Sequence, residues 1–517
     1  MAPQPIAYLL PEGLDLDGLR ARLAEKNNLR EEAAVETEQT AYDSFDWRLW
    51  QAGGVLVQER DGLVRLCWVE RKSGLRLACE STDASPGFAR DLPASQMREL
   101  LAPVLEMRLL LPQVRIIQRQ HTLRVVDDEE KTVVRVTLQE NRFASPDGKQ
   151  TGELEGRVLL KPLKGYDSYF KALRDQLEAM DLALAEQSLY EDALAGISRR
   201  PCDYSSKLNY RLDPEARSDV TAKKIMLTLL DTLEINLQGA KADLDSEFLH
   251  DLRVATRRSR SAMSQIKGVF EPKELAPFKK GFGWIGKVTG EVRDLDVYLL
   301  QYPSYRASLP VALQADLEPF HDFLIKHQKE AQQELVKKLN SPHFRKLLKS
   351  WRAWLNEPVP QRPKAPNARR SIAELSDQRL RKLFATVVRD GEAIGPDSPP
   401  ASLHDLRKQC KKLRYLMEFF QSLYPKPEIR QLIKEVKILL DNLGEFQDLQ
   451  VQAESLEEFG KQMMREGAPA SVLMAMGILV GKLFERQARA RDEFAGLFAA
   501  FGGKGNRQTL QKLLNGE

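Results

Sequence analysis

The stretch HDLRVATRRSRSAMSQIKGVF, residues 250–270, occurs a second time as HDLRKQCKKLRYLMEFFQSLY at residues 404–424. The two copies align without a gap at an offset of 154 residues, and both open with His-Asp-Leu-Arg. On a helix, the basic positions of each copy fall within an arc of about 80°, and apolar positions lie opposite them. The sequence therefore predicts an amphipathic helix with one cationic face, made twice.

We call these two cationic faces the basic stripes. The first stripe contains His250, Arg253, Arg257, Arg258 and Arg260, and the second contains His404, Arg407, Lys411, Lys412 and Arg414. No acid occurs between Arg253 and Lys267, or between Arg407 and Arg414. A solvated helix face usually alternates charge signs, because like charges three and four residues apart repel each other. Arginine forks bind phosphate oxygens bidentately, so the stripes indicate a phosphate-binding site.

The two histidines that open the stripes have two interpretations. A histidine near a helix start often caps or packs the helix, but His250 and His404 are in phase with the arginines, which favours donation to phosphate. The other four histidines show no metal-ligand spacing. The sequence contains no P-loop and no GxSxG motif. We therefore predict no metal site, no cofactor and no catalytic residue.

A second pair of segments repeats at the same offset. GEVRDLDV at residues 290–297 corresponds to GEFQDLQV at residues 444–451. Asp294 and Asp448 are candidates for holding a metal beside a phosphate, but pairing with a basic residue of a neighbouring helix is the favoured interpretation. Arg293 is a weaker candidate for phosphate contact, because the second copy has Gln447 in its place.

The 517 residues exceed one ordinary core, and their patterning changes along the chain. Alternating or β-branched runs predict strands over residues 33–42, 54–58, 63–69, 114–126, 132–138 and 153–160. Helices are expected over residues 16–24, 93–106 and 166–187. This mixture indicates an α+β domain with an antiparallel sheet or barrel at residues 1–195.

Almost everything after residue 216 has a 3.6-residue period. We expect helices over residues 220–237, 248–270, 278–302, 311–339, 342–355, 372–388, 402–423, 426–459 and 470–501. Linkers are expected at residues 196–219 and at the proline-rich residues 357–370. The fold class is thus multidomain, with the α+β domain followed by helical halves at residues 216–356 and 371–501. Duplicated helical units usually pack about a pseudo-two-fold axis, which would bring the two basic stripes together.

Charge is distributed unevenly between the two regions. Residues 1–200 contain 27 Lys and Arg against 33 Asp and Glu, whereas residues 201–517 contain 51 against 41. The C-terminal region is therefore the candidate for meeting a polyanion. The four cysteines are scattered, which favours a reducing compartment without disulfides. MAPQPIAYLL does not resemble a signal peptide and no apolar run is long enough to cross a bilayer, so we expect a cytoplasmic protein without a membrane partner.

The duplicated HDLR helix and its GE-x₂-DL-x-V companion resemble the CHAD domain, the conserved-histidine α-helical domain, over about residues 216–501. The resemblance implies a helical domain with two pseudo-symmetric four-helix halves. It also implies binding of inorganic polyphosphate through the basic stripes, and targeting to polyphosphate granules. The members of both stripes match the family's basic motif.

The N-terminal region resembles the CYTH domain, the triphosphate-tunnel fold that often precedes a CHAD domain. The resemblance rests on residues 41–60, AYDSFDWRLWQAGGVLVQER, and on the DDEE turn at residues 127–130. The family's ExExK signature is replaced by Pro3-Gln4-Pro5-Ile6-Ala7, and residues 156–163, GRVLLKPL, contain no acid. Hydrolysis of a triphosphate needs carboxylates for divalent metal and cations for phosphate, so we expect an inactive domain.

Three hypotheses for function follow. The leading one is a non-catalytic protein that binds inorganic polyphosphate and resides at polyphosphate granules. The alternative is a triphosphatase or polyphosphatase that acts through the N-terminal domain. A nucleic-acid-binding protein is the third, although Tyr415 alone places an aromatic ring near the stripes for base stacking.

Overall fold

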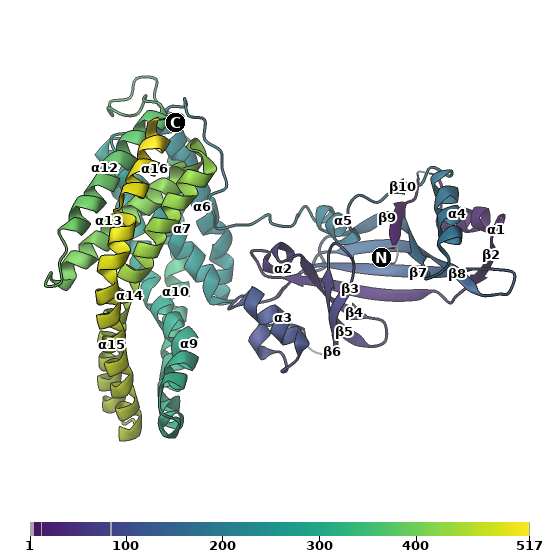
Figure 1. Ribbon diagram of the computed structural model, residues 1–517, viewed down its shortest axis with the longest axis horizontal. Coiled ribbons are helices and arrows are strands. Elements are labelled where there is room, and N and C mark those ends of the chain that lie inside the picture. Colours follow the sequence, from purple (N-terminus) through teal and green to yellow (C-terminus); the bar gives the residue numbers. More distant parts are fainter. Residues whose placement is uncertain (1–4, 12, 83–84, 516–517) are drawn as a thin grey trace. The chain divides into compact units, whose positions relative to one another are not determined.

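The computed structural model describes residues 5–515 except 12, 83 and 84, and the chain forms two compact units, Met1–Ser205 and Ser206–Glu517 (Figure 1). Pro3 and Gln4, where the ExExK signature was sought, lie outside the described residues. The first unit is built on an antiparallel sheet and the second is helical. The predicted multidomain fold class is confirmed.

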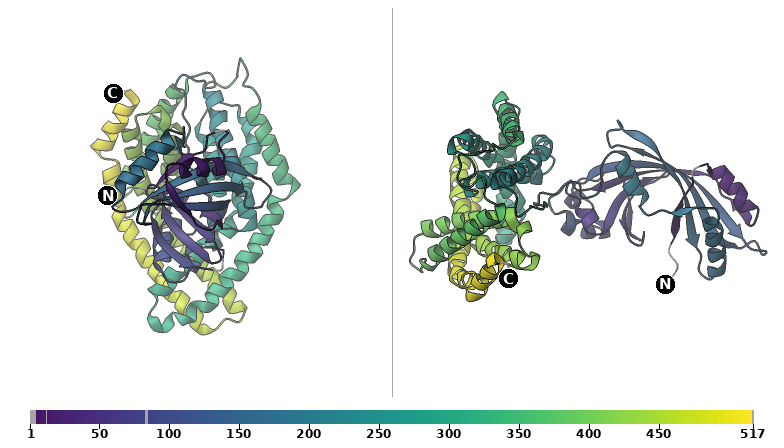
Figure 2. Two further views of the ribbon diagram at one scale, coloured as in Figure 1. Left: turned by 90° about the vertical axis from the view of Figure 1, so that its right-hand side faces the viewer. Right: turned by 90° about the horizontal axis from the view of Figure 1, so that it is seen from above.

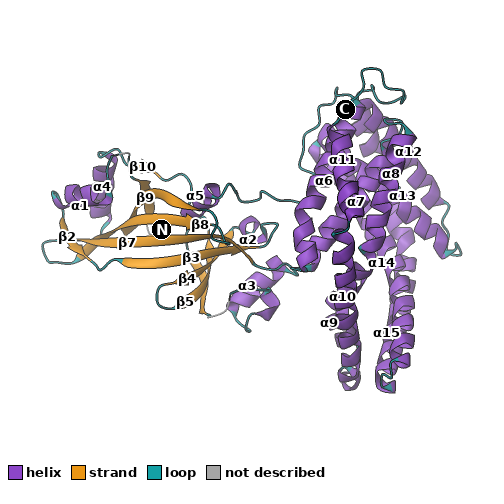
Figure 3. Ribbon diagram, turned by 180° about the vertical axis from the view of Figure 1, so that it is seen from behind, coloured by secondary structure: helices purple, strands orange, loops and turns teal. Residues whose placement is uncertain are grey.

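The first unit contains one curved antiparallel sheet of ten strands (Figure 3). Its strands are β1 Ile6–Leu9, β2 Asn28–Glu31, β3 Val35–Asp43, β4 Gly54–Arg60, β5 Val64–Glu70, β6 Arg76–Ser81, β7 Leu111–Val126, β8 Thr132–Ala144, β9 Thr151–Pro162 and β10 Ala183–Leu184. They are ordered β10-β1-β9-β8-β7-β3-β4-β5-β6, and β2 also pairs with β7. Among the described residues β10 and β6 do not pair with each other, so the sheet is open at these two edges. An antiparallel sheet of this kind is consistent with the tunnel fold that the sequence resembles.

Five helices accompany the sheet: α1 Leu16–Ala24, α2 Arg48–Gln51, α3 Gln96–Leu105, α4 Asp167–Glu178 and α5 Leu189–Gly196. Buried side chains of α1 and α4 pack with those of β7–β9 into one apolar core. Buried residues of α3 pack on β4, β5 and β6 into a second core. Each core forms because the sheet and the helix turn one apolar side towards each other.

The six strands expected from the sequence are all present, and the four that were missed, β1, β2, β6 and β10, have six residues or fewer. The helix expected over residues 166–187 is wrong in its second half. It ends at Glu178, and Asp181 adopts a left-handed backbone with φ 61° that a helix cannot contain. A separate helix, α5, begins only at Leu189.

The expectation that no disulfide is present is also wrong. Cys67 on β5 and Cys79 on β6 are direct cross-strand partners and form a disulfide. The sequence separation of 12 residues gave no framework pattern, but the hairpin register brings the two Cα atoms within 4.2 Å of each other. Cys202 and Cys410 are free thiols.

The second unit contains eleven α-helices within the described residues: α6 Ser218–Ala242, α7 Ser246–Gln265, α8 Pro272–Val288, α9 Gly290–Ser308, α10 Glu318–Leu339, α11 Pro342–Asn356, α12 Ile372–Glu392, α13 Pro400–Phe420, α14 Lys426–Arg465, α15 Ala470–Phe501 and α16 Lys504–Asn515. The helices α6, α7 and α8 begin 154 residues before α12, α13 and α14, respectively. The offset read from the stripes therefore holds for three successive helices. Figure 2 shows the helices of the two halves, teal and green to yellow, on opposite sides of this unit.

Reciprocal contacts show that the two halves are related by a pseudo-two-fold axis. Arg217 and Ser371, which are equivalent residues, face each other in an antiparallel bridge. On either side of this bridge, the Ser218 amide donates to the Arg370 carbonyl and the Ile372 amide donates to the Ala216 carbonyl, each over 2.9 Å. A residue can contact its own equivalent only where a two-fold axis passes between them.

A second set of reciprocal contacts joins α9 and α14. Tyr298 stacks edge-on against Phe459 with ring centroids 5.3 Å apart, and the Tyr305 hydroxyl donates to Oε1 of Gln452 over 3.1 Å. Gln452 is equivalent to Tyr298, and Phe459 is equivalent to Tyr305. The axis therefore also passes between α9 and α14.

The expected helices of this unit differ from the observed ones in three places. The helix expected over residues 278–302 is broken at Thr289 into α8 and α9, whereas its counterpart α14 is continuous. The helix expected to begin at residue 311 begins at Glu318, after two 3₁₀ turns. The sequence analysis missed α16 entirely.

Candidate functional site

The basic stripes lie on α7 and α13, which pack against each other across the pseudo-two-fold axis. Leu252, Ala255 and Met263 of α7 are buried, as are Leu406, Leu413 and Met417 of α13. Each helix thus buries its apolar side in its own half and keeps its cationic side towards the other stripe. The amphipathic pattern predicted from the sequence is what sets this orientation.

Arg257 and Lys411 are equivalent residues of the two stripes and lie close enough to repel each other. The pKa of Lys411 is lowered to about 8, first by burial and then by the charges of Arg407 and Arg257. Asp448 opposes this shift and Arg414 adds to it. Equivalent cations of the two halves therefore lie within each other's electrostatic influence in a basic cluster.

Arg253 and Arg407 are a second equivalent pair, and both are anchored on the neighbouring helix. Arg253 donates from Nη1 to Oγ1 of Thr289 over 2.9 Å and to the Gly286 carbonyl over 3.2 Å. Arg407 donates from Nη2 to both carboxylate oxygens of Asp448, over 3.0 and 3.3 Å. The buried Nε–H of each arginine has no acceptor among the described residues.

The GE-x₂-DL-x-V segments provide the surface on which these two arginines lie. A side chain at Gly444 would begin 3.4 Å from Nη2 of Arg407, and one at Gly290 would begin 3.8 Å from Nη1 of Arg253. Asp448 accepts from Arg407, so the favoured interpretation of this acid holds in the second half. In the first half, Asp294 interacts with Arg253 by charge alone.

Two arginines of the stripes, Arg258 and Arg414, interact with the same carboxylate, that of Glu418. Arg258 donates from Nη2 to Oε2 of Glu418 over 3.0 Å and from Nη1 to the Ser206 carbonyl over 2.8 Å. Arg414 places Nε 3.4 Å from Oε1 of the same Glu418. The side chains of Arg258 and Glu418 are only 14% and 17% exposed, so this ion pair links the two halves. These two arginines contribute less positive charge to the cluster than the sequence suggested.

Arg293 and Lys412 are also engaged. Arg293 donates to the Ser246 carbonyl over 3.1 Å and lies 3.7 Å from Oε1 of Glu247. Lys412 donates to Oε1 of Gln409 over 3.1 Å. Among the described residues, no carboxylate pairs with Arg257, Arg260 or Lys411. Within the part of the chain that the structure describes, these three are the stripe cations best placed to accept an external anion.

The two histidines do not cap their helices. His250 and His404 are both the fifth residue of their helix, and Asp245 provides the N-cap of α7. Nδ1 of His404 lies 2.8 Å from Oε1 of Gln447. An amide oxygen can only accept, so Nδ1 carries the proton and the ring orientation is fixed. The capping interpretation is therefore wrong, and the histidines lie in phase with the arginines.

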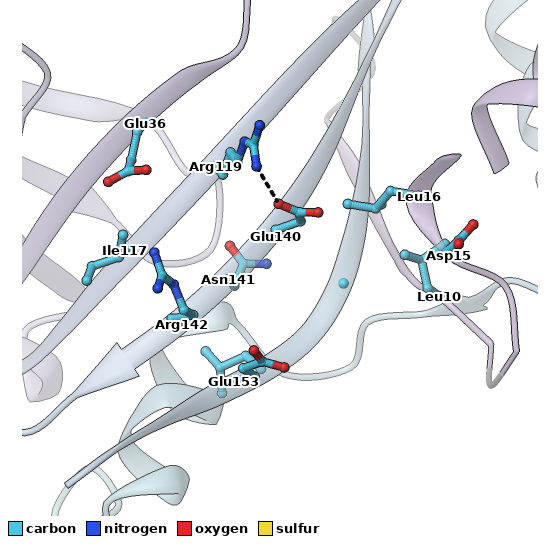
Figure 4. A pocket seen from close by; sticks show the side chains of 12 residues that line it. Leu10, Asp15, Leu16, Glu36, Ile117, Arg119, Glu140, Asn141, Arg142 and Glu153 are labelled. Atoms are coloured by element: carbon cyan, nitrogen blue, oxygen red, sulfur yellow. Dashed lines mark ion pairs between the residues drawn. The ribbon is translucent and has the colours of Figure 1, made fainter. Parts of the chain in front are cut away.

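A cavity of about 570 Å³ lies on the sheet of the first unit (Figure 4). Its charges alternate across the strands, since Arg119 on β7 is the register partner of Glu36 on β3 and of Glu140 on β8. Arg142 on β8 is likewise opposite Glu153 on β9. Each arginine therefore has a carboxylate beside it, and the lining acids outnumber the cations.

Across residues 5–515, apart from 12, 83 and 84, no three His, Cys, Asp or Glu side chains are placed to hold a metal ion. In the same part of the chain, no helix is both long and apolar enough to span a membrane.

The comparisons with known proteins match the geometry of the helical unit. The family model described as the CHAD domain matches residues 224–457, a range that contains both basic stripes. No curated protein matches the chain. The crystal structure of the CHAD domain from the plant Ricinus communis is 26% identical, covers 57% of this chain and 95% of its own, and has a TM-score of 0.49.

Two further solved structures are more distant. PptA from Streptomyces chartreusis is 14% identical, covers 55% of this chain and 99% of its own, and has a TM-score of 0.44. A putative adenylyl cyclase, HpAC1 from Hippeastrum, whose structure is described as revealing a dominant triphosphatase activity, is 12% identical. It covers 39% of this chain and 99% of its own, with a TM-score of 0.27.

Proposed function

Residues 224–457 form a CHAD domain, and from this premise we propose that its basic cluster binds inorganic polyphosphate. One observation carries the proposal: Arg257 and Lys411, equivalent cations of the two halves, lie on helices α7 and α13 that pack against each other, and among the described residues neither forms an ion pair with a carboxylate. Like charges held together in a partly buried site cost stability unless an anion joins them. A chain of phosphates supplies that anion at successive positions along both stripes.

Binding of polyphosphate by the whole protein tests the proposal. The double variant Arg257→Glu and Lys411→Glu should lower the affinity for long-chain polyphosphate by at least a hundredfold, because it replaces one cation of each stripe with an acid. The matched control is Lys346→Glu with Lys349→Glu, which makes the same charge change on exposed residues of α11. Equal affinities of the two double variants would mean that the cluster is not the site.

The salt dependence of binding provides a second readout. Neutralising the phosphates of a chain releases its counterions, so affinity should fall steeply as the salt concentration rises. The double variant Arg257→Glu and Lys411→Glu should show a shallower dependence of affinity on salt concentration than the parent, because fewer phosphates are neutralised. A slope that the variant leaves unchanged would count against the cluster.

We further propose that the first unit is not catalytic. The ion pair of Arg119 with Glu140, over 3.9 Å, supports this, as does the excess of acids over cations in the lining of the cavity. The expected result is no release of phosphate from tripolyphosphate in Mg²⁺ or Mn²⁺. Release that disappears in Arg119→Ala would instead make this unit a triphosphatase.

Binding of polyphosphate would direct the protein to polyphosphate granules. A fluorescent fusion should therefore concentrate at granules in cells that make polyphosphate. It should become diffuse when Arg257 and Lys411 are both replaced by Glu. A diffuse parent protein would remove granule association from the proposal.

A further inference from the structure

The helix α16 is the counterpart of α11 in the first half of the helical unit. HQKEAQQEL at residues 327–335 resembles RQARARDEF at residues 486–494, at an offset of 159, and this offset maps α11 onto residues 501–515, which contain α16. In addition, α11 contacts α6 and α8, whereas α16 contacts α12 and α14, which are the equivalents of α6 and α8 (Figure 1). The two halves can therefore be compared position by position at these helices.

In the first half, a polar clamp joins α6 to α11. Nη2 of Arg352 on α11 donates to Oδ1 of Asp231 over 2.7 Å and to Oε2 of Glu234 over 2.5 Å, and both acids are on α6. The neighbouring Trp351 is fully buried. A charged centre and a large aromatic ring thus hold these two helices together.

In the second half, every member of this clamp is changed. Ala385 and Val388 replace the two acids, Gln511 replaces the arginine and Leu510 replaces the tryptophan. At these residues a groove of about 380 Å³ lies between α12 and α16. Its floor is apolar, because Phe384, Val388 and Leu510 are buried. A concave apolar surface of this volume is typical of a site for a small molecule.

The charge around the groove is also reversed between the halves. Three arginines line it, and each replaces an apolar residue of the first half. These arginines are Arg381, Arg389 and Arg507, in the positions of Leu227, Ile235 and Leu348. Among the lining residues, Glu392 is the one acid. The first half therefore has an apolar rim around a charged centre, and the second half has a cationic rim around an apolar centre.

Two of the three arginines already have a partner. Arg507 forms an ion pair with Glu392, which joins α16 to α12 at one end of the groove. Arg389 pairs with the adjacent Asp390 over 2.7 Å. Neither guanidinium is therefore the first choice for an anion in the groove.

Arg381 is the cation that is available. It is exposed, and no carboxylate forms an ion pair with it within the part of the chain that the structure describes. Asp377, one turn earlier on α12, accepts from the Tyr424 hydroxyl over 2.7 Å. Arg381 and Glu392 are 11 residues apart on one helix, which separates them by about 16 Å. The groove thus has an available cation at one end and a closed ion pair at the other.

We propose that the groove between α12 and α16 binds an organic anion with one acidic head and an apolar chain, that is, a long-chain carboxylate. The carboxylate accepts from the guanidinium of Arg381, and the chain lies over the apolar floor towards the pair of Arg507 and Glu392. An acidic helix of a partner protein would need available cations on both walls of the groove, and on α16 the arginine is neutralised. The basic stripes lie on other helices, so this site does not depend on the proposed function.

Calorimetric titration of the whole protein with decanoate, below the concentration at which it forms micelles, tests the proposal. One decanoate should bind per protein. Arg381→Leu, which introduces the residue of the first half, should lower the affinity about tenfold, because the head loses its charge-assisted hydrogen bonds. Arg345→Leu, which removes an exposed arginine from α11, is the matched control and should have no effect. Decan-1-ol, which has no charge, should bind the parent and Arg381→Leu equally.

Transplanting the clamp of the first half tests the groove itself. The triple variant Ala385→Asp, Val388→Glu and Gln511→Arg should close the groove and abolish decanoate binding. Val388 is buried, so thermal unfolding has to show that this variant folds. Ala385→Trp fills the groove from an exposed position without adding charge, and it should also abolish binding. Polyphosphate affinity should be the same in Ala385→Trp as in the parent.

The proposal is overturned if the parent does not bind decanoate, or if Arg381→Leu and Ala385→Trp both bind it as the parent does. It is also overturned if a helical peptide with leucines on one face and glutamates beside them binds the parent and decanoate does not displace it. In that case the groove is a docking site for a helix.

The proposed function fails on different evidence, since it depends on polyphosphate binding and on the double variant Arg257→Glu and Lys411→Glu. That double variant should bind decanoate with the affinity of the parent. Loss of decanoate binding in the double variant would place the carboxylate at the basic stripes and overturn the groove as its site.

Discussion

Lys411 gives the basic cluster a pH dependence that an arginine in its place would not have. Its pKa is lowered to about 8 by burial and by Arg407, Arg257 and Arg414, with Asp448 opposing them. A bound polyanion favours the charged amine, so affinity should fall about fivefold from pH 7 to pH 9 as Lys411 loses its proton. Lys411→Arg should flatten the curve, because a guanidinium stays charged. Titrations at pH 7, 8 and 9 check this, and parallel curves for the two proteins would contradict it.

The same lysine should limit the stability of the unbound protein. In the unfolded chain Lys411 keeps its proton up to about pH 10.4, whereas in the fold it loses the proton near pH 8. Between these values the unfolded chain binds more protons, so stability rises with pH across this window. Below it, Lys411→Met should stabilise the unbound protein by about 1 kcal/mol, after allowance for solvent screening.

Thermal unfolding at two pH values measures the effect of Lys411→Met. The gain should be present at pH 7 and should vanish at pH 10, where the parent lysine is also uncharged in the fold. Polyphosphate affinity at pH 7 should fall about tenfold in the same variant, since one cation of the second stripe is lost. A stabilisation that persists at pH 10 would indicate improved packing instead of relieved charge.

The stripes illustrate what sequence can predict about single residues. The spacing of the cations along α7 and α13 follows from helix geometry and was readable without a structure. The partner of Arg258 was not, because Glu418 reaches it from the other half of the domain, 160 residues away, whereas Arg414 and Glu418 form an i,i+4 pair that the sequence does show. Charge that is neutralised by a distant segment has no signature in a local window. The sequence therefore identified the cluster but overestimated how many of its cations are available.

Close packing between helices depends on glycine at one position of α6. A side chain at Gly239 would begin 2.2 Å from Cδ1 of Phe248, which is buried on α7. Gly239→Ala should therefore destabilise the helical unit by about 2 kcal/mol, because the two helices have to move apart. Chemical denaturation followed by circular dichroism at the helical signal measures this cost.

A second helical glycine provides the control. Nothing lies within 4 Å of a side chain built at Gly283 on α8. Gly283→Ala should stabilise the protein by about 0.5–1 kcal/mol, because alanine loses less backbone entropy in a helix. If both substitutions changed stability in the same direction, the effect of Gly239→Ala on stability would be set by helix propensity and not by contact with Phe248.

The break between α8 and α9 is a feature of the secondary structure that the sequence did not predict. The apolar period continues through this region, so the sequence predicted one helix. The break lies at Thr289, whose hydroxyl donates to the Ile285 carbonyl over 2.8 Å and accepts from Arg253. A side chain that bonds to its own helix competes with the regular backbone pattern. In α14 the equivalent residue is Leu443, which cannot do this, and the helix continues.

For the whole molecule, the 154-residue offset contained more information than any motif. It predicted two related halves, and the reciprocal contacts across the axis are what such a duplication produces. The disulfide between Cys67 and Cys79 was not predictable in this way, because it depends on the register of one hairpin in an unrepeated unit. In the helical unit the same pattern occurs at two places in the sequence, so each copy supports the interpretation of the other. The first unit has no such repeat.

The ion pair between Arg258 and Glu418 should hold the two halves together without taking part in anion binding. Glu418→Ala leaves Arg258 and Arg414 without their shared carboxylate in a mostly buried site, which should cost about 2–3 kcal/mol. Asp405→Asn is the control: it breaks the exposed pair with Lys408 and should leave stability nearly unchanged. Chemical denaturation, followed by hydrogen exchange in α7 and α13, measures both costs.

Binding separates this role from that of Arg257 and Lys411. Glu418→Ala removes a negative charge beside the cluster and releases two arginines from it, so polyphosphate affinity should be unchanged or higher even though the fold is weaker. Substitutions that remove a cation from the stripes are expected to reduce affinity. A Glu418→Ala protein that is both less stable and weaker in binding would show that the ion pair sets the distance between the stripes, and that the geometry of the two halves, more than their charge, determines the affinity.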